Sequence, residues 1–347
     1  MSDTEFDLIS IGDATIDDFF FIHDANVNCK VDANICQICI NYGDKLPVDK
    51  FVSLVAGNAA NNAVGSSRLG LKTAFYVVLG NDEAGRRIKA QMEADGVDSR
   101  YIILKDDDET NISFVMSFKG ERTIFVYHVH HKYKLPDLAK ARWAYLTSTG
   151  PGFEPMFKEV LQYVKKSGVK LAYNPGTYQL RGDEALMSEV LKASEVSFVN
   201  VEEAQHILGA KDKNIKNLLS GMREMGSAIS VITDAREGAY CYDGHEYLHI
   251  PEFNQERVET TGAGDAFATA FIAALHYDLP VSEALRWGSV NANSVVQKTG
   301  PQAGLLQKNA LEQRLHANPE YLPNLLKNDL DFQNKDAAGA TAAASAG

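Results

Sequence analysis

Short apolar runs alternate with segments of helical spacing along most of the chain. The first run, Phe6–Ile11, ends at a glycine and predicts a buried strand. Similar runs predict strands at 73–79, 143–147, 169–173, 196–199 and 228–233. Between them, apolar residues at helical spacing predict helices at 58–70, 84–95, 155–167, 183–193 and 215–225. Repeated β–α units of this kind predict an α/β fold, with a mostly parallel sheet covered by helices on both faces.

Two regions interrupt the alternation, at residues 13–50 and 101–134. Short strand patterns occur at 19–22 and 35–41, and the runs 111–118 and 122–128 flank a Lys-Gly-Glu turn that is typical of a β-hairpin. We expect these regions to form a small β-sheet lid outside the main sheet. Residues 1–330 then form one domain, and the Ala- and Gly-rich residues 331–347 are predicted to be a disordered tail.

Composition and charge narrow the function classes. Apolar residues make up 45% and charged residues 23% of the chain, as in ordinary globular proteins. The 34 Lys and Arg against 46 Asp and Glu give a net charge of −12, which disfavours nucleic acid and anionic membranes as partners. The acidic, polar N-terminus lacks the pattern of a signal or transit peptide, and no apolar stretch is long enough to span a bilayer. These features predict a cytoplasmic protein.

The four cysteines are too few and too scattered for a disulfide scaffold, which agrees with a reducing compartment. Cys36 and Cys39 have CxxC spacing, but the residues around them alternate like a strand and offer no second ligand pair. Packing thiols are favoured here over a metal or redox site.

The segment 259–275, ETTGAGDAFATAFIAAL, carries the most specific chemistry. Its second half is small or apolar on every side, so it predicts a helix buried in the core. Gly262, Ala263 and Gly264 have little or no side chain, which leaves the amides of the helix N-terminus open to an anion. Beside them, Asp265 could accept a proton from a hydroxyl that attacks a phosphate. Asp265 could equally cap a buried helix, and the residues alone leave both roles open.

The run TTGAGDAF resembles the C-terminal signature of the ribokinase-like (PfkB) carbohydrate kinases. The similarity extends from about Leu8 to about Gln307, with several segments in the order of the family. The resemblance implies a three-layer α/β/α fold with a small β-sheet lid. It also implies an enzyme that transfers the γ-phosphate of ATP, with Mg²⁺, to a sugar hydroxyl. Asp265 is then the catalytic base, and Gly262, Ala263 and Gly264 form the anion hole.

Two further segments match the substrate motifs of this family. Asp13 and Asp17, in GDATID after the first strand, can accept hydrogen bonds from sugar hydroxyls. In AGNAAN, the resemblance assigns Gly57, Asn58 and Asn61 to substrate binding. Asn58 replaces a usual glycine, so the sugar's identity stays open.

Other matches concern the nucleotide and its ions. In NVEE, the resemblance assigns Asn200 and Glu203 to the phosphates and to Mg²⁺ held through water, with helix capping as the alternative for Asn200. Thr233 and Gly238 match the nucleotide loop. Glu259 stands where the family usually has Asp near a monovalent cation, so Glu259 and Thr261 form a candidate K⁺ site.

Two side-chain groups in the predicted lid have less specific interpretations. His128 and His130 share one face of a predicted strand, and a wet lid surface or a substrate contact is favoured over zinc. Arg122 is interpreted as a solvated turn residue rather than a contact to a phosphorylated substrate.

Three functions remain open at this point. The first is a kinase for a ribose- or fructose-like sugar, and the second is an adenosine-like nucleoside kinase with an apolar shelf from residues 19–21 and Tyr42. The third is a catalytically silent sugar sensor. Because exposed lid strands of this family often pair between subunits, the resemblance also implies a homodimer.

Overall fold

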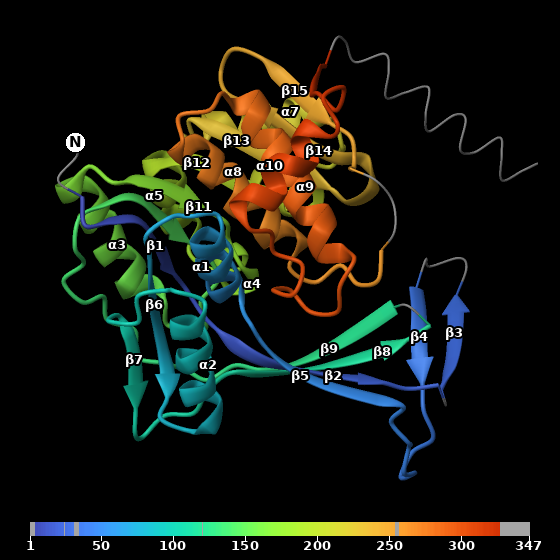
Figure 1. Ribbon diagram of the computed structural model, residues 1–347. Coiled ribbons are helices and arrows are strands. Elements are labelled where there is room, and N and C mark those ends of the chain that lie inside the picture. The colour runs from blue at the N-terminus through green and yellow to red at the C-terminus, as the bar shows by residue number, and fades with distance from the viewer. Residues whose placement is uncertain (1–3, 24, 31–34, 120, 254–256, 327–347) are drawn as a thin grey trace, which may run out of the picture.

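The computed structural model describes residues 4–23, 25–30, 35–119, 121–253 and 257–326, and the predicted tail at 331–347 lies outside this range. Within the described residues, ten strands form one sheet in the order β16-β15-β14-β13-β12-β11-β10-β1-β6-β7 (Figure 1). Their bounds are β1 Phe6–Ile11, β6 Thr73–Gly80, β7 Ile102–Lys105, β10 Ala141–Leu146, β11 Lys170–Tyr173, β12 Ser194–Asn200, β13 Ile229–Asp234, β14 Gly238–Tyr242, β15 Tyr247–Ile250 and β16 Asn324–Leu325. The predicted α/β class and strand positions are confirmed.

The sheet is parallel from β7 to β13 and antiparallel only at the edge formed by β14, β15 and β16. Ile9 in β1, for example, stands opposite Ala144 in β10 and Ala74 in β6. Neighbouring parallel strands need crossover connections, which the helices provide. The carboxyl ends of these strands therefore meet along one edge of the sheet, where α/β proteins bind their ligands.

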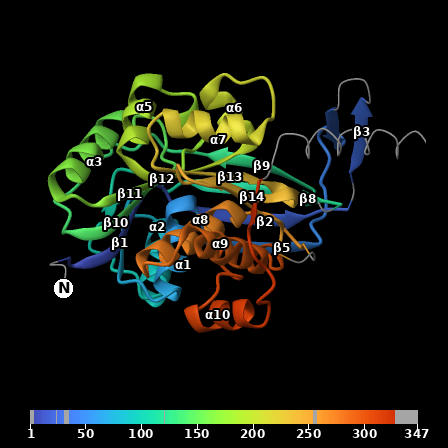
Figure 2. The ribbon, with the colours of Figure 1, turned by 90° about the horizontal axis from the view of Figure 1, so that it is seen from above.

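Helices cover both faces of the sheet, which gives the three layers that the sequence predicts (Figure 2). One face carries α3 Glu154–Ser167, α5 Glu184–Ala193, α6 Val201–Leu208 and α7 Ile215–Glu224. The other carries α1 Asn58–Arg68, α8 Ala263–His276, α9 Val281–Val296 and α10 Lys308–His316. Two more helices are α2 Glu83–Ala94 and the short α4 Thr177–Leu180. No helix of the described part of the chain is both long and apolar enough to cross a bilayer.

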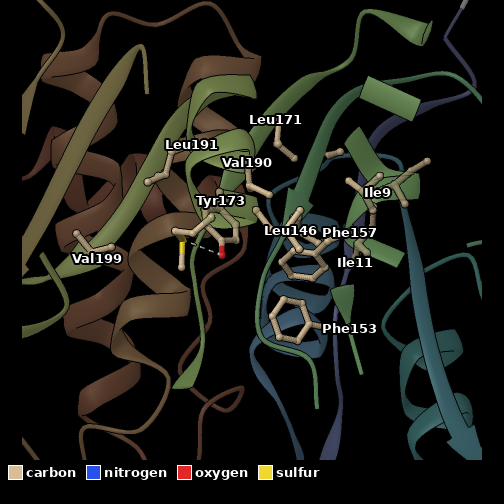
Figure 3. Close-up of a cluster of buried hydrophobic side chains, with 14 of the residues drawn as sticks. Ile9, Ile11, Leu146, Phe153, Phe157, Leu171, Tyr173, Val190, Leu191 and Val199 are labelled. Carbon is tan, nitrogen blue, oxygen red and sulfur yellow. Dashed lines mark hydrogen bonds between the residues drawn. The ribbon is translucent and has the colours of Figure 1, made fainter. Parts of the chain in front are cut away.

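The core between β1, β10, β11 and the α3–α5 pair illustrates how the strands are fixed (Figure 3). Ile9 and Leu146 are fully buried, and Phe153 and Phe157 pack edge to face with ring centroids 4.8 Å apart. Burial on both faces explains why these strands are continuous apolar runs rather than alternating ones.

A second sheet forms the expected lid, in the order β5-β2-β8-β9. Its strands are β2 Thr15–Phe21, β5 Lys50–Ala56, β8 Ile112–Phe118 and β9 Glu121–Tyr127, and a separate hairpin joins β3 Asn26–Lys30 to β4 Ile35–Cys39. Figure 1 shows this small sheet extending away from the main layers.

The structure corrects two limits of the predicted lid. Ile102–Lys105 is not a lid strand but pairs in parallel with β6 at the edge of the main sheet. Conversely, β5 continues the lid beyond residue 50 to Ala56. A four-residue strand carries no pattern that says which sheet it joins, because that choice depends on the β6–α2–β7 crossover.

Ala235 holds a backbone conformation that favours glycine. It begins a 3₁₀ turn at Ala235–Glu237 between β13 and β14, and its φ is 41°. A side chain makes this left-handed conformation unfavourable.

We therefore expect Ala235→Gly to raise the free energy of unfolding by about 0.5–1 kcal/mol, since the strain relieved exceeds the added entropy of the unfolded chain. Thermal unfolding measures the change. The matched control is Ala239→Gly, because Ala239 is buried in β14 and the same replacement should destabilise there by about 1 kcal/mol. An unchanged or lowered midpoint temperature of unfolding for Ala235→Gly would contradict the claim that Ala235 is strained.

Candidate active site

Two cavities meet at the first turn of α8. The first, of about 490 Å³, lies between the small sheet and the carboxyl ends of the parallel strands, and the second, of about 370 Å³, lies beside β13, α8 and α9. Thr233, Thr260, Ala263 and Gly264 line both cavities. A group that bridges the cavities must therefore pass directly over the start of α8.

The start of α8 is shaped by two glycines with different roles. Gly262 has a left-handed φ of 79°, and a Cβ there would lie 2.4 Å from the Cβ of Pro301. At Gly264 a Cβ would meet nothing within 4 Å. Packing thus requires glycine at 262, whereas Gly264 leaves open space in front of the first-turn amides, which have no acceptor within the helix. This opening fits an anion.

Asp265 follows this turn and lines the first cavity, although its side chain is only 7% exposed. One carboxylate oxygen, Oδ2, accepts a hydrogen bond of 2.8 Å from Nδ2 of Asn61. Burial raises the pKa of Asp265 to about 6; the Asn61 hydrogen bond opposes the rise, and the nearby Glu203 adds to it. A carboxylate with such a pKa is ionised at neutral pH and is a stronger proton acceptor than an exposed aspartate.

Asp13 and Asp17, the residues for which the sequence predicts sugar binding, also line the first cavity. Both oxygens of Asp13 accept from the hydroxyl of Tyr133, at 2.9 and 3.1 Å, and burial raises the pKa of Asp13 to about 7. Burial likewise raises the pKa of Asp17 to about 6. Oδ1 of Asp17 has no hydrogen-bond partner among the described residues, so it is available to a ligand.

The AGNAAN segment joins the small sheet to α1 and also reaches the first cavity. Gly57 has φ 102°, and a Cβ there would lie 2.6 Å from the Cα of Ala14. Only glycine therefore allows the two backbone segments to approach each other this closely. Gly57, Asn58 and Asn61 all line the cavity. Asn61 also bonds Asp265, a contact that the sequence does not reveal.

Asn200 and Glu203 line the first cavity from the end of β12, and they also form a capping box on α6. Oδ1 of Asn200 accepts from the amide of Glu203 and Oε2 of Glu203 accepts from the amide of Asn200, both at 2.8 Å. Asn200 therefore does cap α6, as the alternative for this residue predicts. Nδ2 of Asn200 and Oε1 of Glu203 take no part in the capping box. Burial raises the pKa of Glu203.

Thr233 and Gly238 line the second cavity together with Ala235. A Cβ at Gly238 would lie 2.1 Å from the carbonyl oxygen of Ile250, so glycine is required there by the neighbouring strand β15. The remaining wall combines the apolar side chains of Phe267, Ala292 and Val296 with the charged side chains of Glu252 and Arg257. Its apolar part suits a planar ring.

Arg122 on β9 of the small sheet reaches the loop before α8. It donates to Oε1 of Glu259 at 2.5 Å and to the hydroxyl of Thr260 at 2.7 Å. The interpretation of Arg122 as a solvated turn residue is wrong. The same Glu259 oxygen accepts from the amide of Thr261 at 2.7 Å and from its hydroxyl. A guanidinium thus supplies positive charge beside the predicted K⁺ site.

The lid histidines and the cysteines show no converging ligand set. In the described ranges, no three His, Cys, Asp or Glu side chains come together to hold a metal. His128 lines the first cavity and lies against Tyr178, with ring centroids 5.5 Å apart. Cys39 is exposed on β4, and the side chain of Cys36 is outside the described part.

Sequence reasoning missed Tyr133, Tyr178 and Gln302. Tyr133 holds Asp13, Tyr178 lines the first cavity, and Nε2 of Gln302 donates to Oδ1 of Asn61 at 3.1 Å. Each lies outside the recognisable motifs, so no signal in the sequence could have found it.

The chain is similar to several characterised proteins. It is 27% identical over 290 residues to the 5-dehydro-2-deoxygluconokinase of Bacillus subtilis. The aligned residues cover 77% of this chain and 88% of that enzyme. It is 25% identical over 283 residues to a nucleoside kinase of Methanothermobacter thermautotrophicus, with 80% and 89% covered. The structure of Arabidopsis thaliana ribokinase complexed with ribose and ATP superposes with a TM-score of 0.74 at 20% identity, over 89% of this chain and 98% of that one.

The model of the pfkB family carbohydrate kinases matches residues 25–309, a range that includes the first turn of α8 and Asp265 but begins after Asp13 and Asp17. The chain therefore belongs to the pfkB family of carbohydrate kinases and has the ribokinase fold.

Proposed function

We propose that this kinase transfers the γ-phosphate of ATP to a hydroxyl of a neutral sugar, with Asp265 as the catalytic base. The observation that carries the proposal is the position of Asp265, a buried carboxylate beside an open helix N-terminus at the junction of two cavities. The first cavity would hold the sugar and the second the adenosine. The ribokinase that superposes on this chain is described as bound to ribose and ATP, which supports this division.

Each side chain has a defined task in this reaction. Asp13 and Asp17 accept hydrogen bonds from sugar hydroxyls and orient the sugar. Asp265 then takes the proton of the attacking hydroxyl, while the first-turn amides at Ala263 and Gly264 stabilise negative charge on the phosphoryl oxygens. Glu203 and Asn200 would hold Mg²⁺ through water, and that ion neutralises phosphate charge when bound. Closure of the small sheet excludes water from the transfer.

The charge of the first cavity favours an uncharged substrate. Asp13, Asp17, Glu203 and Asp265 line it, and no lysine or arginine does so among the described residues. The guanidinium of Arg122, next to this cavity, is already bonded to Glu259 and Thr260. A carboxylate or phosphate on the sugar would therefore find no unpaired positive partner among the described lining residues, and the ionised acids of the cavity would repel it. A neutral substrate would differ from that of the Bacillus subtilis relative, whose name denotes a gluconate derivative.

A nucleoside is the second candidate substrate, because the lid offers apolar surface to the first cavity. Ile124 and Val126 line the cavity from β9 and are 43% and 58% exposed, and Tyr178 faces them from α4. A nucleobase could cover these groups. The shelf predicted from residues 19–21 and Tyr42 is wrong: Phe19 is buried, Tyr42 is fully exposed, and neither lines the cavity.

Two other predictions bear on the proposal. Membership in a family of kinases, together with Asp265 beside the open turn, favours an enzyme over the silent sugar sensor. The homodimer through the small sheet remains a proposal. Phe125 and Tyr127, which alternate with the cavity-lining residues of β9, are 55% and 49% exposed, and an edge strand with apolar side chains is suited to pairing with a second copy.

A panel of matched substrates tests the proposed function. ADP release is measured with glucose against gluconate, fructose against fructose 6-phosphate, and adenosine against AMP. The neutral member of the preferred pair should have a kcat/KM at least about 100-fold higher, because burying an unpaired like charge costs several kcal/mol. Equal turnover of the charged members would exclude the neutral-substrate proposal, and no turnover of any member would favour the sensor.

Replacement of the base should abolish transfer without loss of nucleotide binding. The amide of Asp265→Asn cannot accept the proton, so kcat should fall by on the order of 10²–10⁴-fold while ATP affinity, measured by calorimetry, stays within a few-fold. A variant with near-normal kcat would rule out Asp265 as the base.

The wild-type kcat/KM should decline as the pH falls through about 6, because the base is active only when ionised, its pKa in the free enzyme is raised to about 6, and kcat/KM reports the ionisation of the free enzyme. Burial also raises the pKa of Asp13 and Asp17, so titration of these substrate-binding residues should make the decline steeper than for one group. A kcat/KM that stays constant to one unit below that pH would contradict the assignment.

The two glycines of the α8 turn should respond oppositely to alanine. Gly264→Ala should change the free energy of unfolding by less than about 0.5 kcal/mol but lower kcat on the order of 10²-fold, because its methyl group occupies the space for the phosphoryl oxygens. Gly262→Ala should destabilise by about 2 kcal/mol or more, because it clashes with Pro301 at a left-handed φ. Thermal unfolding and ADP release separate the two effects, and normal activity of Gly264→Ala would refute the phosphate cradle.

A further inference from the structure

The side-chain amide of Asn61 is hydrogen-bonded at both ends inside the protein. Its nitrogen donates to Oδ2 of Asp265 at 2.8 Å, and its oxygen accepts from Nε2 of Gln302 at 3.1 Å. Asn61, Asp265 and Gln302 are 2%, 7% and 9% exposed. Three segments that are far apart in the sequence thus form one buried chain of hydrogen bonds that ends on Asp265.

We propose that Gln302 is a positioning residue for Asp265, because it fixes the orientation in which the Asn61 amide meets the carboxylate. This inference rests on the proposed role of Asp265 as base. An asparagine side chain can present either its NH₂ group or its oxygen to a neighbour by rotating half a turn. The Gln302 NH₂ group can only donate, so it holds the Asn61 oxygen and turns the Asn61 NH₂ group toward Asp265. The opposite orientation would place an oxygen lone pair against the carboxylate.

Gln302 is held in place independently of Asn61. Its main-chain carbonyl oxygen accepts a hydrogen bond from Nη1 of Arg68 at 2.7 Å. Nη2 of Arg68 is in turn 2.8 Å from Oδ1 of Asp95. The preceding residue, Pro301, packs against Gly262. The loop between α9 and α10 therefore supports both the turn that opens α8 and the hydrogen bonds to Asp265. This support fixes the main chain from which the Gln302 side chain reaches the Asn61 oxygen.

The environment of Asp265 makes this orientation important. Burial and the negative charge of Glu203 favour its protonated form, and the hydroxyl of Tyr145 is the other titratable group close to it. The Asn61 hydrogen bond acts in the opposite direction and stabilises the ionised form. No lysine or arginine of the described chain lines this cavity. Loss of the Asn61 orientation should therefore raise the pKa of Asp265 further, so that the base is lost at a higher pH.

The test is the pH profile of kcat in full-length Gln302→Met, which keeps the length of the side chain and removes the donor without adding charge. The acidic limb should move to higher pH by about one unit, since part of the stabilisation that the Asn61 hydrogen bond gives the ionised carboxylate is lost. At pH values well above the limb, kcat should remain within a few-fold of wild type. A purely structural role would lower kcat equally at all pH values and leave the limb in place.

A double-mutant cycle shows whether Gln302 acts through Asn61. In an Asn61→Ala background, the limb is already shifted, and adding Gln302→Met should move it no further. The matched control is Gln205→Met, since Gln205 also donates to an oxygen, that of Asp212, but lies on α6 away from Asp265. Its pH profile should equal that of wild type. If Gln302→Met unfolds, Gln302→Leu, which also lacks a donor and adds no charge, replaces it and should shift the limb in the same direction.

An unshifted limb in a folded Gln302 variant overturns the inference, and so does an equal shift in the Asn61→Ala background. Failure of the proposed function is distinguishable, because in that case Asp265→Asn would retain activity.

Discussion

The structure depends on how a carboxylate is accommodated at the first turn of an almost wholly buried helix. Removing Asp265 from water disfavours its charge, and the protein offsets this with the hydrogen bond from the Asn61 side chain. The offset is incomplete, so the pKa of Asp265 stays above that of a free aspartate. This incomplete compensation leaves the residue both ionised at neutral pH and ready to take a proton.

The same turn organises the two cavities. Gly262 is pressed against Pro301, and Gly264 faces open space, so the main chain itself forms the passage between the cavities. Arg122 extends this organisation to the small sheet, because it ties β9 to Glu259 and Thr260 directly before the turn. The small sheet is therefore hydrogen-bonded to the loop that leads into the α8 turn.

The sequence predicted much of the site because its key residues lie in short local patterns. The glycines and Asp265 fall within four consecutive positions, and Asp13 and Asp17 follow a strand at a fixed spacing. Each pattern can be recognised without knowledge of the remainder, although the residues alone left Asp265 open between a base and a helix cap, and the family resemblance favoured the base. Arg122 and Asn61 were interpreted differently, since their partners are 137 and 204 positions away. Nothing local to either residue indicates such a partner.

The amino-acid sequence by itself determined the alternation of strands and helices, the parallel sheet and the chemical character of the α8 turn, because these follow from the periodicity of apolar residues and from backbone freedom at glycine. Only the tertiary structure decided which sheets β7 and β5 join and that Arg122 pairs with Glu259. It also decided that Gln302, 241 positions from Asn61, completes the hydrogen bonds behind Asp265. Those contacts form when the chain closes on itself, and their geometry is set by the packing of whole layers rather than by neighbouring residues.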